Sequence, residues 1–233
     1  YGRTEGEIDT VRAIARSTDT FFYKVGEFVG PERLAFWARK FGLGQDSGVD
    51  LPGEVSGLVP DPEWKLKTKG ERWFLGNTYH MAIGQGDVAA SPLQVNVMTS
   101  VVASGGKRCR PKVVQVEQVD QVEQGCEELG IGEETLKVIR KGMLGACATG
   151  GTAFPFFNFE PSVACKTGTA QTVGENTHAW LTAFGGLPNE SGSGNFRINP
   201  NIVLTVLVEE GGEGSRVAGP VAREILQEWF SEQ

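Results

Sequence analysis

Apolar side chains in the first forty residues recur at the spacing of α-helices. The periodic runs lie at 8–15, 21–29 and 34–41. Residues three and four positions apart share one face of a helix, so each run predicts a helix packed against a core. Ser17-Thr18-Asp19 separates the first two runs, which predicts a helix break there and a new N-cap.

The middle of the chain shows both irregular and helical patterns. Glycine, proline and polar residues are frequent over 43–80, where we expect a long surface excursion anchored by two tryptophans. Ser91-Pro92 predicts a helix start, because serine caps helices and proline is favoured at the first helical position, and Gly105-Gly106 predicts its end. Valine alternates with polar residues over 112–122, as in a short strand or hairpin, and another helix is expected over 133–148.

The last third changes from a helical to a strand period. Strand-like runs lie at 163–171, 178–186 and 202–208, and the longest turn between them is 187–200. A closing amphipathic helix is expected over 217–230.

Helices followed by a strand meander and a further helix predict an α+β fold with an antiparallel sheet. No linker or repeat divides the chain. We expect one domain over 1–233, mainly helical over 1–160, with the sheet meander and closing helix over 161–233.

Composition excludes some classes of function. The 233 residues include 22 basic and 29 acidic side chains, for a net charge of -7, which argues against a nucleic-acid binder. Four cysteines and two histidines are present without a C-x-x-C pair, so we expect no metal site. Cys147 and Cys165 lie in apolar runs and are predicted to be buried thiols. Cys109 and Cys126 could pair, and the sequence leaves that open.

Lys166-Thr167-Gly168-Thr169 is the strongest candidate for chemistry. It follows the apolar run Val163-Ala164-Cys165, as a strand entering from the core would. Alternation places Lys166 and Gly168 on one face and the two threonines on the other. At a sheet edge, a ligand could gain backbone hydrogen bonds, a cation and hydroxyl donors, and Gly168 would allow close approach. The alternative is an ordinary surface strand.

Ser17-x-Asp19 is a second candidate. A hydroxyl and a carboxylate at a helix boundary are often only capping groups. A capping position is also rigid, so it could present both side chains to a cleft.

These two motifs, about 150 positions apart, resemble the second and third motifs of the penicillin-binding protein transpeptidases. Other segments resemble class B members of that family in the same order. They are Leu51-Pro52-Gly53-Glu54, Ile83-Gly84-Gln85-Gly86, Ser91-Pro92-Leu93-Gln94 and His178-Ala179-Trp180. The resemblance runs from about residue 6 to residue 230 and is greatest to the cell-elongation subgroup, penicillin-binding protein 2. It implies the penicillin-binding-protein/serine β-lactamase-like fold, with three of five sheet strands in this chain.

The resemblance implies roles for each site residue. Lys166 would attract the terminal carboxylate of the substrate, and the hydroxyls of Thr167 and Thr169 would bind it, with Gly168 leaving room. The backbone N–H of Thr169 would form one arm of the oxyanion hole, worth about 3 kcal/mol. Ser17 would relay a proton to the leaving amine, and Asp19 would orient the substrate or the catalytic lysine.

The first motif of the family, the nucleophile in S-x-x-K, is not recognisable before Ser17. The one S-x-x-K spacing in the chain is Ser104-Gly105-Gly106-Lys107. We reject it because two glycines at a helix end do not hold a helical turn and because it follows Ser17. We therefore expect the domain to be incomplete at its N-terminus. The nucleophile would come from a missing N-terminal segment or a second chain.

The resemblance implies a peptidoglycan D,D-transpeptidase that cross-links stem peptides through a serine acyl-enzyme and binds β-lactam antibiotics. No cofactor is implied. The parent protein would be anchored by an N-terminal helix and act at the periplasmic face of the inner membrane, with a lipid-II polymerase of the elongation complex as a possible partner. The alternatives are a serine β-lactamase or D,D-carboxypeptidase, and a non-catalytic binding module that retains the cleft.

Overall fold

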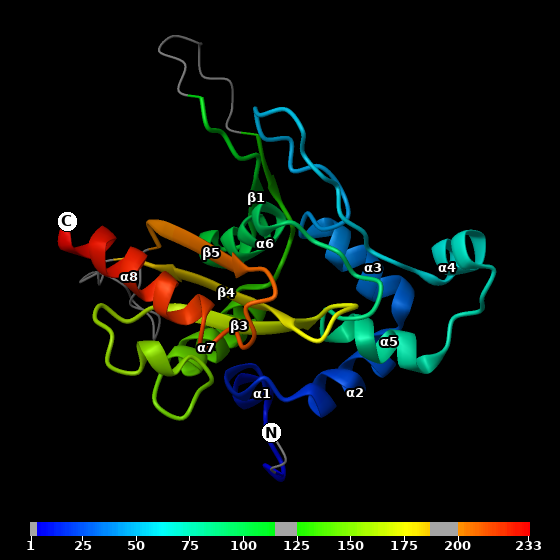
Figure 1. Cartoon of the computed structure of the whole chain (residues 1–233), viewed down its shortest axis with the longest axis horizontal. Helices are drawn as coiled ribbons and strands as arrows, with labels where there is room; N and C mark the ends of the chain where they lie inside the picture. Colours follow the sequence, from blue (N-terminus) through cyan, green and yellow to red (C-terminus); the bar gives the residue numbers. More distant parts are fainter. Residues whose placement is uncertain (1–3, 115–124, 187–199) are drawn as a thin grey trace. The chain divides into compact units, whose positions relative to one another are not determined.

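The structure is a computed structural model that describes residues 4–114, 125–186 and 200–233 (Figure 1). It divides into two units. The sheet unit combines the chain up to Thr18 with Gly132–Gln233, and the helical unit is Asp19–Ile131. The strand or hairpin expected over 112–122 and the turn over 187–200 lie largely outside the described residues.

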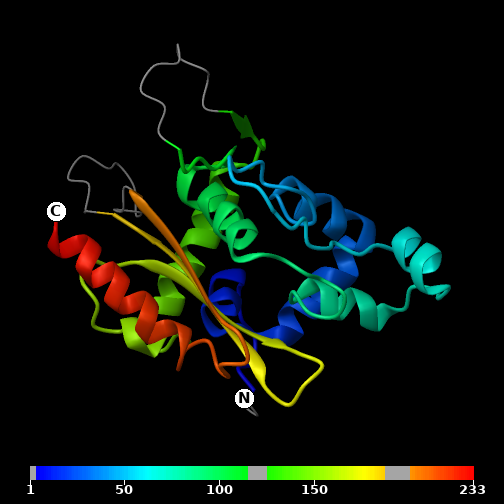
Figure 2. The ribbon, with the colours of Figure 1, turned by 45° about the horizontal axis from the view of Figure 1, so that its top comes forward.

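The sheet unit contains three antiparallel strands in the order β3-β4-β5. They are β3 (Ala164–Gln171), β4 (Thr177–Gly185) and β5 (Ile202–Val208), which confirms the three predicted strand runs. Strand β3 therefore has β4 on one side and forms an edge of this sheet as described. The expected closing helix is α8 (Ala218–Ser231), and it packs against β4 and β5 (Figures 1 and 2).

Two further helices complete the sheet unit. Helix α7 (Glu133–Cys147) confirms the prediction over 133–148 and packs against both β3 and α1 (Thr10–Arg16). A short 3-10 turn, η1 (Phe154–Phe156), contributes Phe156 to the core and contacts α8 and α7. The apolar core lies on the sheet face that α8 covers. Its fully buried members include Cys165, Ala179, Leu181, Ala183, Ala218, Ala222 and Leu226.

The helical unit begins with α2 (Asp19–Val29) and α3 (Pro31–Lys40), as the periodic runs predict. Helix α6 (Pro92–Ser104) starts at Ser91, whose side chain accepts from the backbone of Gln94, and ends at Gly105 in the left-handed conformation. Both boundaries confirm the prediction. A short ribbon follows, formed by β1 (Lys107–Cys109) and β2 (Cys126–Glu128).

The prediction of an irregular excursion over 43–80 is wrong in part, because it contains α4 (Pro62–Lys69) and starts α5 (Leu75–Ala82). Asp61 caps α4 by accepting from the backbone of Trp64. The only buried residue of α4 is Lys65, so no apolar period marks this helix. Of the two tryptophans, Trp73 does pack against the small core of this unit.

The cysteines form two disulfides. Cys109 pairs with Cys126 across β1 and β2, which settles the open question from the sequence. Cys147 and Cys165 also form a disulfide, so the prediction of two buried thiols is wrong about the thiols although both residues are buried. The bond joins the end of α7 to the start of β3. Within the described ranges, no helix has the length and apolar character needed to cross a membrane.

Candidate functional site

Lys166 and Ser17 meet in the sheet unit. The ammonium of Lys166 donates to the Ser17 hydroxyl over 2.8 Å and to the carbonyl of Thr167 over 2.7 Å. Lys166 is half-buried on the edge strand β3, and Ser17 follows the last residue of α1. The structure thus brings together the two leading members of the predicted site.

Ser17 is the C-cap of α1, so the prediction that this segment provides an N-cap is wrong for Ser17. Its backbone has φ 54° and ψ 53°, the left-handed conformation, and the N–H of Thr18 donates back to Ala13. This is the usual way to end a helix, although glycine normally occupies the position. The hydroxyl is thereby left to bind Lys166 rather than a helix N-terminus.

Close helix packing brings Ser17 to the sheet. On α7, a Cβ added at Gly142 would lie 2.6 Å from Cβ of Ile14, and one added at Gly145 would lie 3.0 Å from Cβ of Ala15. Only glycine leaves room for α1 at this distance. The end of α1 therefore lies beside the end of α7, next to β3.

The remaining residues of the K-T-G-T segment are also held in place. The Thr167 hydroxyl shares a 2.8 Å hydrogen bond with that of Thr152. The exposed Thr169 hydroxyl accepts from the N–H of Gly214 over 3.3 Å. Gly168 lies opposite Trp180, and a Cβ there would come within 3.1 Å of Cβ of Trp180. A side chain at position 168 would therefore be tightly packed against Trp180, whether or not a ligand approaches it.

Asp19, the remaining predicted site residue, is the first residue of α2 and belongs to the helical unit. It supplies the acidic residue in the first turn of that helix, where a carboxylate is favourable. Its proposed role beside Ser17 stays a prediction.

Sequence reasoning missed several residues that organise the sheet unit. Arg16 donates to the carbonyls of Gly150 and Gly151 over 2.9 and 3.3 Å, and to Glu5 over 2.5 Å. The hydrogen bond from Arg16 holds the pKa of the Glu5 carboxyl below its ordinary value. Thr152 was missed as well. The contacts of Arg16 with Gly150 and Gly151 join residues far apart in the chain, and no motif or helical spacing in the sequence marks them.

In the helical unit, the motif Ser91-Pro92-Leu93-Gln94 has a structural role. The fully buried Gln94 donates to the carbonyls of Gln45 and Ser56, each over 2.7 Å, and accepts from the N–H of Ser91 over 2.9 Å. Glu54 accepts from the backbone N–H groups of Ser47 and Gly48. The long loop after α3 is therefore fixed by side chains whose hydrogen bonds are satisfied.

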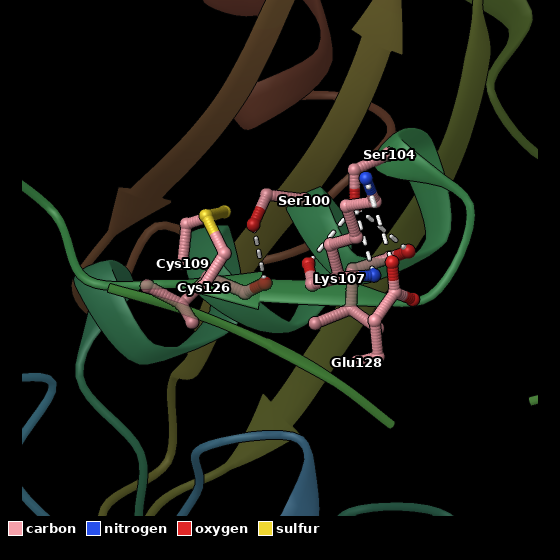
Figure 3. Close-up of a disulfide and its surroundings, with 8 residues drawn as sticks. Ser100, Ser104, Lys107, Cys109, Cys126 and Glu128 are labelled. Atoms are coloured by element: carbon pink, nitrogen blue, oxygen red, sulfur yellow. Dashed lines mark hydrogen bonds and ion pairs between the residues drawn. A yellow bond between two sulfur atoms is a disulfide. The ribbon is translucent and has the colours of Figure 1, made fainter. Parts of the chain in front are cut away.

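The rejected spacing Ser104 to Lys107 does not form a helical pair (Figure 3). The Ser104 hydroxyl bonds with the N–H and carbonyl of Lys107 over 3.2 and 2.9 Å. Lys107 lies in β1, and its ammonium is 3.4 Å from Glu128. A serine engaged with the backbone, and a lysine paired with a carboxylate on the neighbouring strand, do not form the family's nucleophile motif.

A metal site is not apparent in the ranges that the structure describes, where no three His, Cys, Asp or Glu side chains are grouped suitably. His178 accepts from the backbone N–H of Glu210 over 3.0 Å. It therefore supports the turn after β5.

This chain is similar in sequence and structure to known proteins that are longer than it is. The peptidoglycan D,D-transpeptidase MrdA of Haemophilus influenzae is 32% identical over 98% of this chain and 37% of its own length. In a solved complex of penicillin-binding protein PBP2 with MreC from Helicobacter pylori, a chain is 35% identical. It has a TM-score of 0.81 over 95% of this chain and 39% of its own. A chain from a peptidoglycan synthase complex has a TM-score of 0.82 and 31% identity, over 97% of this chain and 38% of its own.

The chain thus spans less than two fifths of these relatives. The fold agrees with the resemblance found in the sequence. The family model described as the penicillin binding protein transpeptidase domain matches residues 1–227, and the chain belongs to that family.

Proposed function

We propose that the protein containing this chain is a peptidoglycan D,D-transpeptidase that cross-links stem peptides through a serine acyl-enzyme. The observation that carries the proposal is the hydrogen bond between Lys166 and Ser17 in a member of this family. An ammonium that donates to the Ser17 oxygen leaves the Ser17 hydrogen available for the leaving amine. Lys166 can then replace that proton.

The other residues of the K-T-G-T segment would bind the acyl donor. The hydroxyls of Thr167 and Thr169 would hold the terminal carboxylate of a D-Ala-D-Ala peptide, and Gly168 would keep the edge of β3 approachable. The N–H of Thr169 would stabilise the oxyanion. Asp19 would orient the substrate amide or the lysine of the nucleophile motif. β-Lactams would bind as mimics of the same terminus.

The nucleophilic serine would lie in a part of the protein outside this sequence. The only S-x-x-K spacing in the chain is the one at Ser104, whose hydroxyl is engaged with the backbone. A transpeptidase of this family needs the serine and lysine on one helical turn. Either an N-terminal segment or a second chain would supply it.

Two disulfides support a location outside the cytoplasm, because disulfides persist in oxidising compartments. We place the domain at the periplasmic face of the inner membrane, on a protein anchored by an N-terminal helix. The partners of its relatives suggest an elongation complex. PBP2 of H. pylori was solved with MreC, and another relative belongs to a peptidoglycan synthase complex, which is consistent with a lipid-II polymerase as partner.

Intact-mass spectrometry of the full-length protein after incubation with a fluorescent penicillin tests the proposal. We expect one covalent increment that persists for hours, and peptide mapping should place it on a serine outside this sequence. An adduct lost within seconds would indicate a β-lactamase or carboxypeptidase instead. The absence of any adduct would indicate a non-catalytic binding module.

A further inference from the structure

Ser17 has a backbone conformation that needs support. It is one of two non-glycine residues with positive φ in the described part of the chain, and the other is Glu210. The left-handed conformation costs about 1 kcal/mol or more for a residue with a side chain, and it persists only where the surroundings impose it. Contacts near Ser17 must therefore hold its backbone in this conformation beside Lys166.

The preceding residue, Arg16, makes the contacts that anchor the end of α1. Its guanidinium spans the carbonyls of Gly150 and Gly151, while its Nε donates to Glu5. These carbonyls follow the C-terminus of α7, where a cation is favourable. Helix α7 has no basic residue in its own last turn. Arg16 therefore donates from α1 to the loop that directly follows the end of α7.

The segment that Arg16 contacts is also fastened to β3. Just before it, Cys147 is bonded to Cys165, the neighbour of Lys166. Just after it, Thr152 is hydrogen-bonded to Thr167. Residues 147–152, which we call the bracket loop, are thus tied to the strand on both sides of Lys166. Arg16 ties the residue before Ser17 to the same loop.

We propose that Arg16 is a positioning residue, which fixes Ser17 against Lys166 by clamping the end of α1 to the bracket loop. The inference rests on the proposed function for its catalytic consequence. Arg16 does not contact the reacting atoms in this arrangement, and it acts through the backbone of Ser17. A planar guanidinium suits the role because it donates to two carbonyls and a carboxylate in one plane, which an ammonium does not do.

Arg12 offers a matched control. It lies one turn earlier on α1 and also pairs with Glu5, over 3.0 Å. Its side chain is 49% exposed, whereas that of Arg16 is 25% exposed. Removing Arg12 takes away the same charge from the same helix and leaves the clamp on the bracket loop in place.

The test uses the full-length protein as wild type, Arg16→Gln, Arg16→Lys and Arg12→Gln. Rapid mixing with a fluorescent penicillin separates the dissociation constant of the first complex from the acylation rate. We expect Arg16→Gln to slow acylation about tenfold, which corresponds to about 1.4 kcal/mol, with the dissociation constant changed less than threefold. Arg16→Lys should fall in between, and Arg12→Gln should stay within about twofold of wild type.

Hydrogen exchange of the same proteins provides a second measurement that does not depend on activity. The amide of Thr18 is protected by its bond to Ala13. It should exchange about tenfold faster in Arg16→Gln and at the wild-type rate in Arg12→Gln. Wild-type acylation and exchange rates in a folded Arg16→Gln protein would overturn the inference, and the same result in Arg16→Lys would do so if Arg16→Gln fails to fold.

Failure of the proposed function gives a different result. If the wild-type protein forms no adduct, the transpeptidase proposal fails. The exchange rate of Thr18 still decides whether Arg16 positions Ser17. An unchanged rate in Arg16→Gln would then overturn the inference on its own.

Discussion

Lys166 donates to the Ser17 hydroxyl over 2.8 Å, although 149 positions separate the two residues. The contact depends on two packing arrangements in the sheet unit. Glycines on α7 allow α1 to approach closely, and the disulfide between Cys147 and Cys165 joins α7 to the strand of Lys166. The geometry of the site therefore depends on packing inside this unit. Substitutions at positions that do not contact Lys166 should affect it.

Gly214 is one such position. It lies against the backbone carbonyls of Gly168 and Trp180, and its N–H donates to Thr169. We expect Gly214→Ala to force the loop away from the sheet and to destabilise the protein by about 2 kcal/mol. Thermal unfolding measures this loss, and the affinity for penicillin should fall with the displacement of Thr169.

Gly76→Ala is the matched control, because a Cβ at Gly76 on helix α5 would meet nothing within 4 Å. Alanine is also the better helix former, so this substitution should be neutral or stabilising by up to about 1 kcal/mol. Equal melting temperatures for Gly214→Ala and wild type would contradict the packing that the structure gives for the loop.

The two disulfides should differ in their response to reductant. Cys126 is exposed, whereas Cys147 and Cys165 are buried in the core. Mild reduction of the folded protein followed by alkylation should therefore label Cys109 and Cys126 alone. Peptide mapping checks this, and equal labelling of Cys147 and Cys165 would be inconsistent with their burial.

Loss of the buried disulfide should also lower stability. Cys147 and Cys165 are 18 positions apart, and closure of a loop of this length constrains the unfolded chain by about 3 kcal/mol. Urea unfolding of a Cys109→Ser/Cys126→Ser variant, with and without a strong reductant, measures the contribution of the buried disulfide alone. A protein with free thiols at both positions before reduction would contradict the structure.

Gln94 is predicted to be important for stability and not for chemistry. Gln94→Met keeps the volume of the side chain but leaves the carbonyls of Gln45 and Ser56 without their buried donor. We expect a loss of about 2 kcal/mol in the free energy of unfolding, measured by urea titration. The exposed Gln227→Met should change it by less than about 0.5 kcal/mol, and an equal effect of the two substitutions would be evidence against this assignment.

The pair of Glu5 and Arg16 predicts a pH dependence of stability. Because the pKa of Glu5 is lower in the folded protein than its ordinary value, its ionised form stabilises the fold at neutral pH. This contribution is complete above the ordinary pKa and is lost as the pH falls through the lower folded pKa.

Melting temperatures of wild type and Glu5→Gln, recorded from about pH 6 to about pH 3, should converge as the pH falls. The difference between them should shrink at high salt, since the pair is only partly buried. A constant difference across the whole range would show that Glu5 contributes through packing instead.

The sequence predicted those elements that have a clear apolar period. Helices α7 and α8 bury residues at helical spacing, β4 and β5 are rich in apolar residues, and α6 begins at a serine-proline pair. Helix α4 was missed because its only buried residue is a lysine and Leu66 is 58% exposed. The capping signal of Asp61 followed by Pro62 was present and would have found it.

The sequence predicted which residues belong to the candidate site, and it did not predict the contacts that bring them together. Ser17 and Lys166 were identified from their motifs, yet the left-handed cap at Ser17 has no glycine to mark it. The contact between Arg16 and Gly150 joins residues 134 positions apart. The disulfide of Cys147 was hidden because its apolar neighbours are equally typical of a buried thiol. Pairing of this kind is decided by tertiary packing.

A double-mutant cycle on the full-length protein tests the central claim, that Ser17 and Lys166 act as one unit in proton transfer. The acylation rate with a fluorescent penicillin is measured for wild type, Ser17→Ala, Lys166→Met and the double variant. Each single substitution should slow acylation about 100-fold, and the double variant should be scarcely slower than either single one. Losses that multiply to about 10,000-fold in the double variant would show that the two residues act independently and would contradict the account.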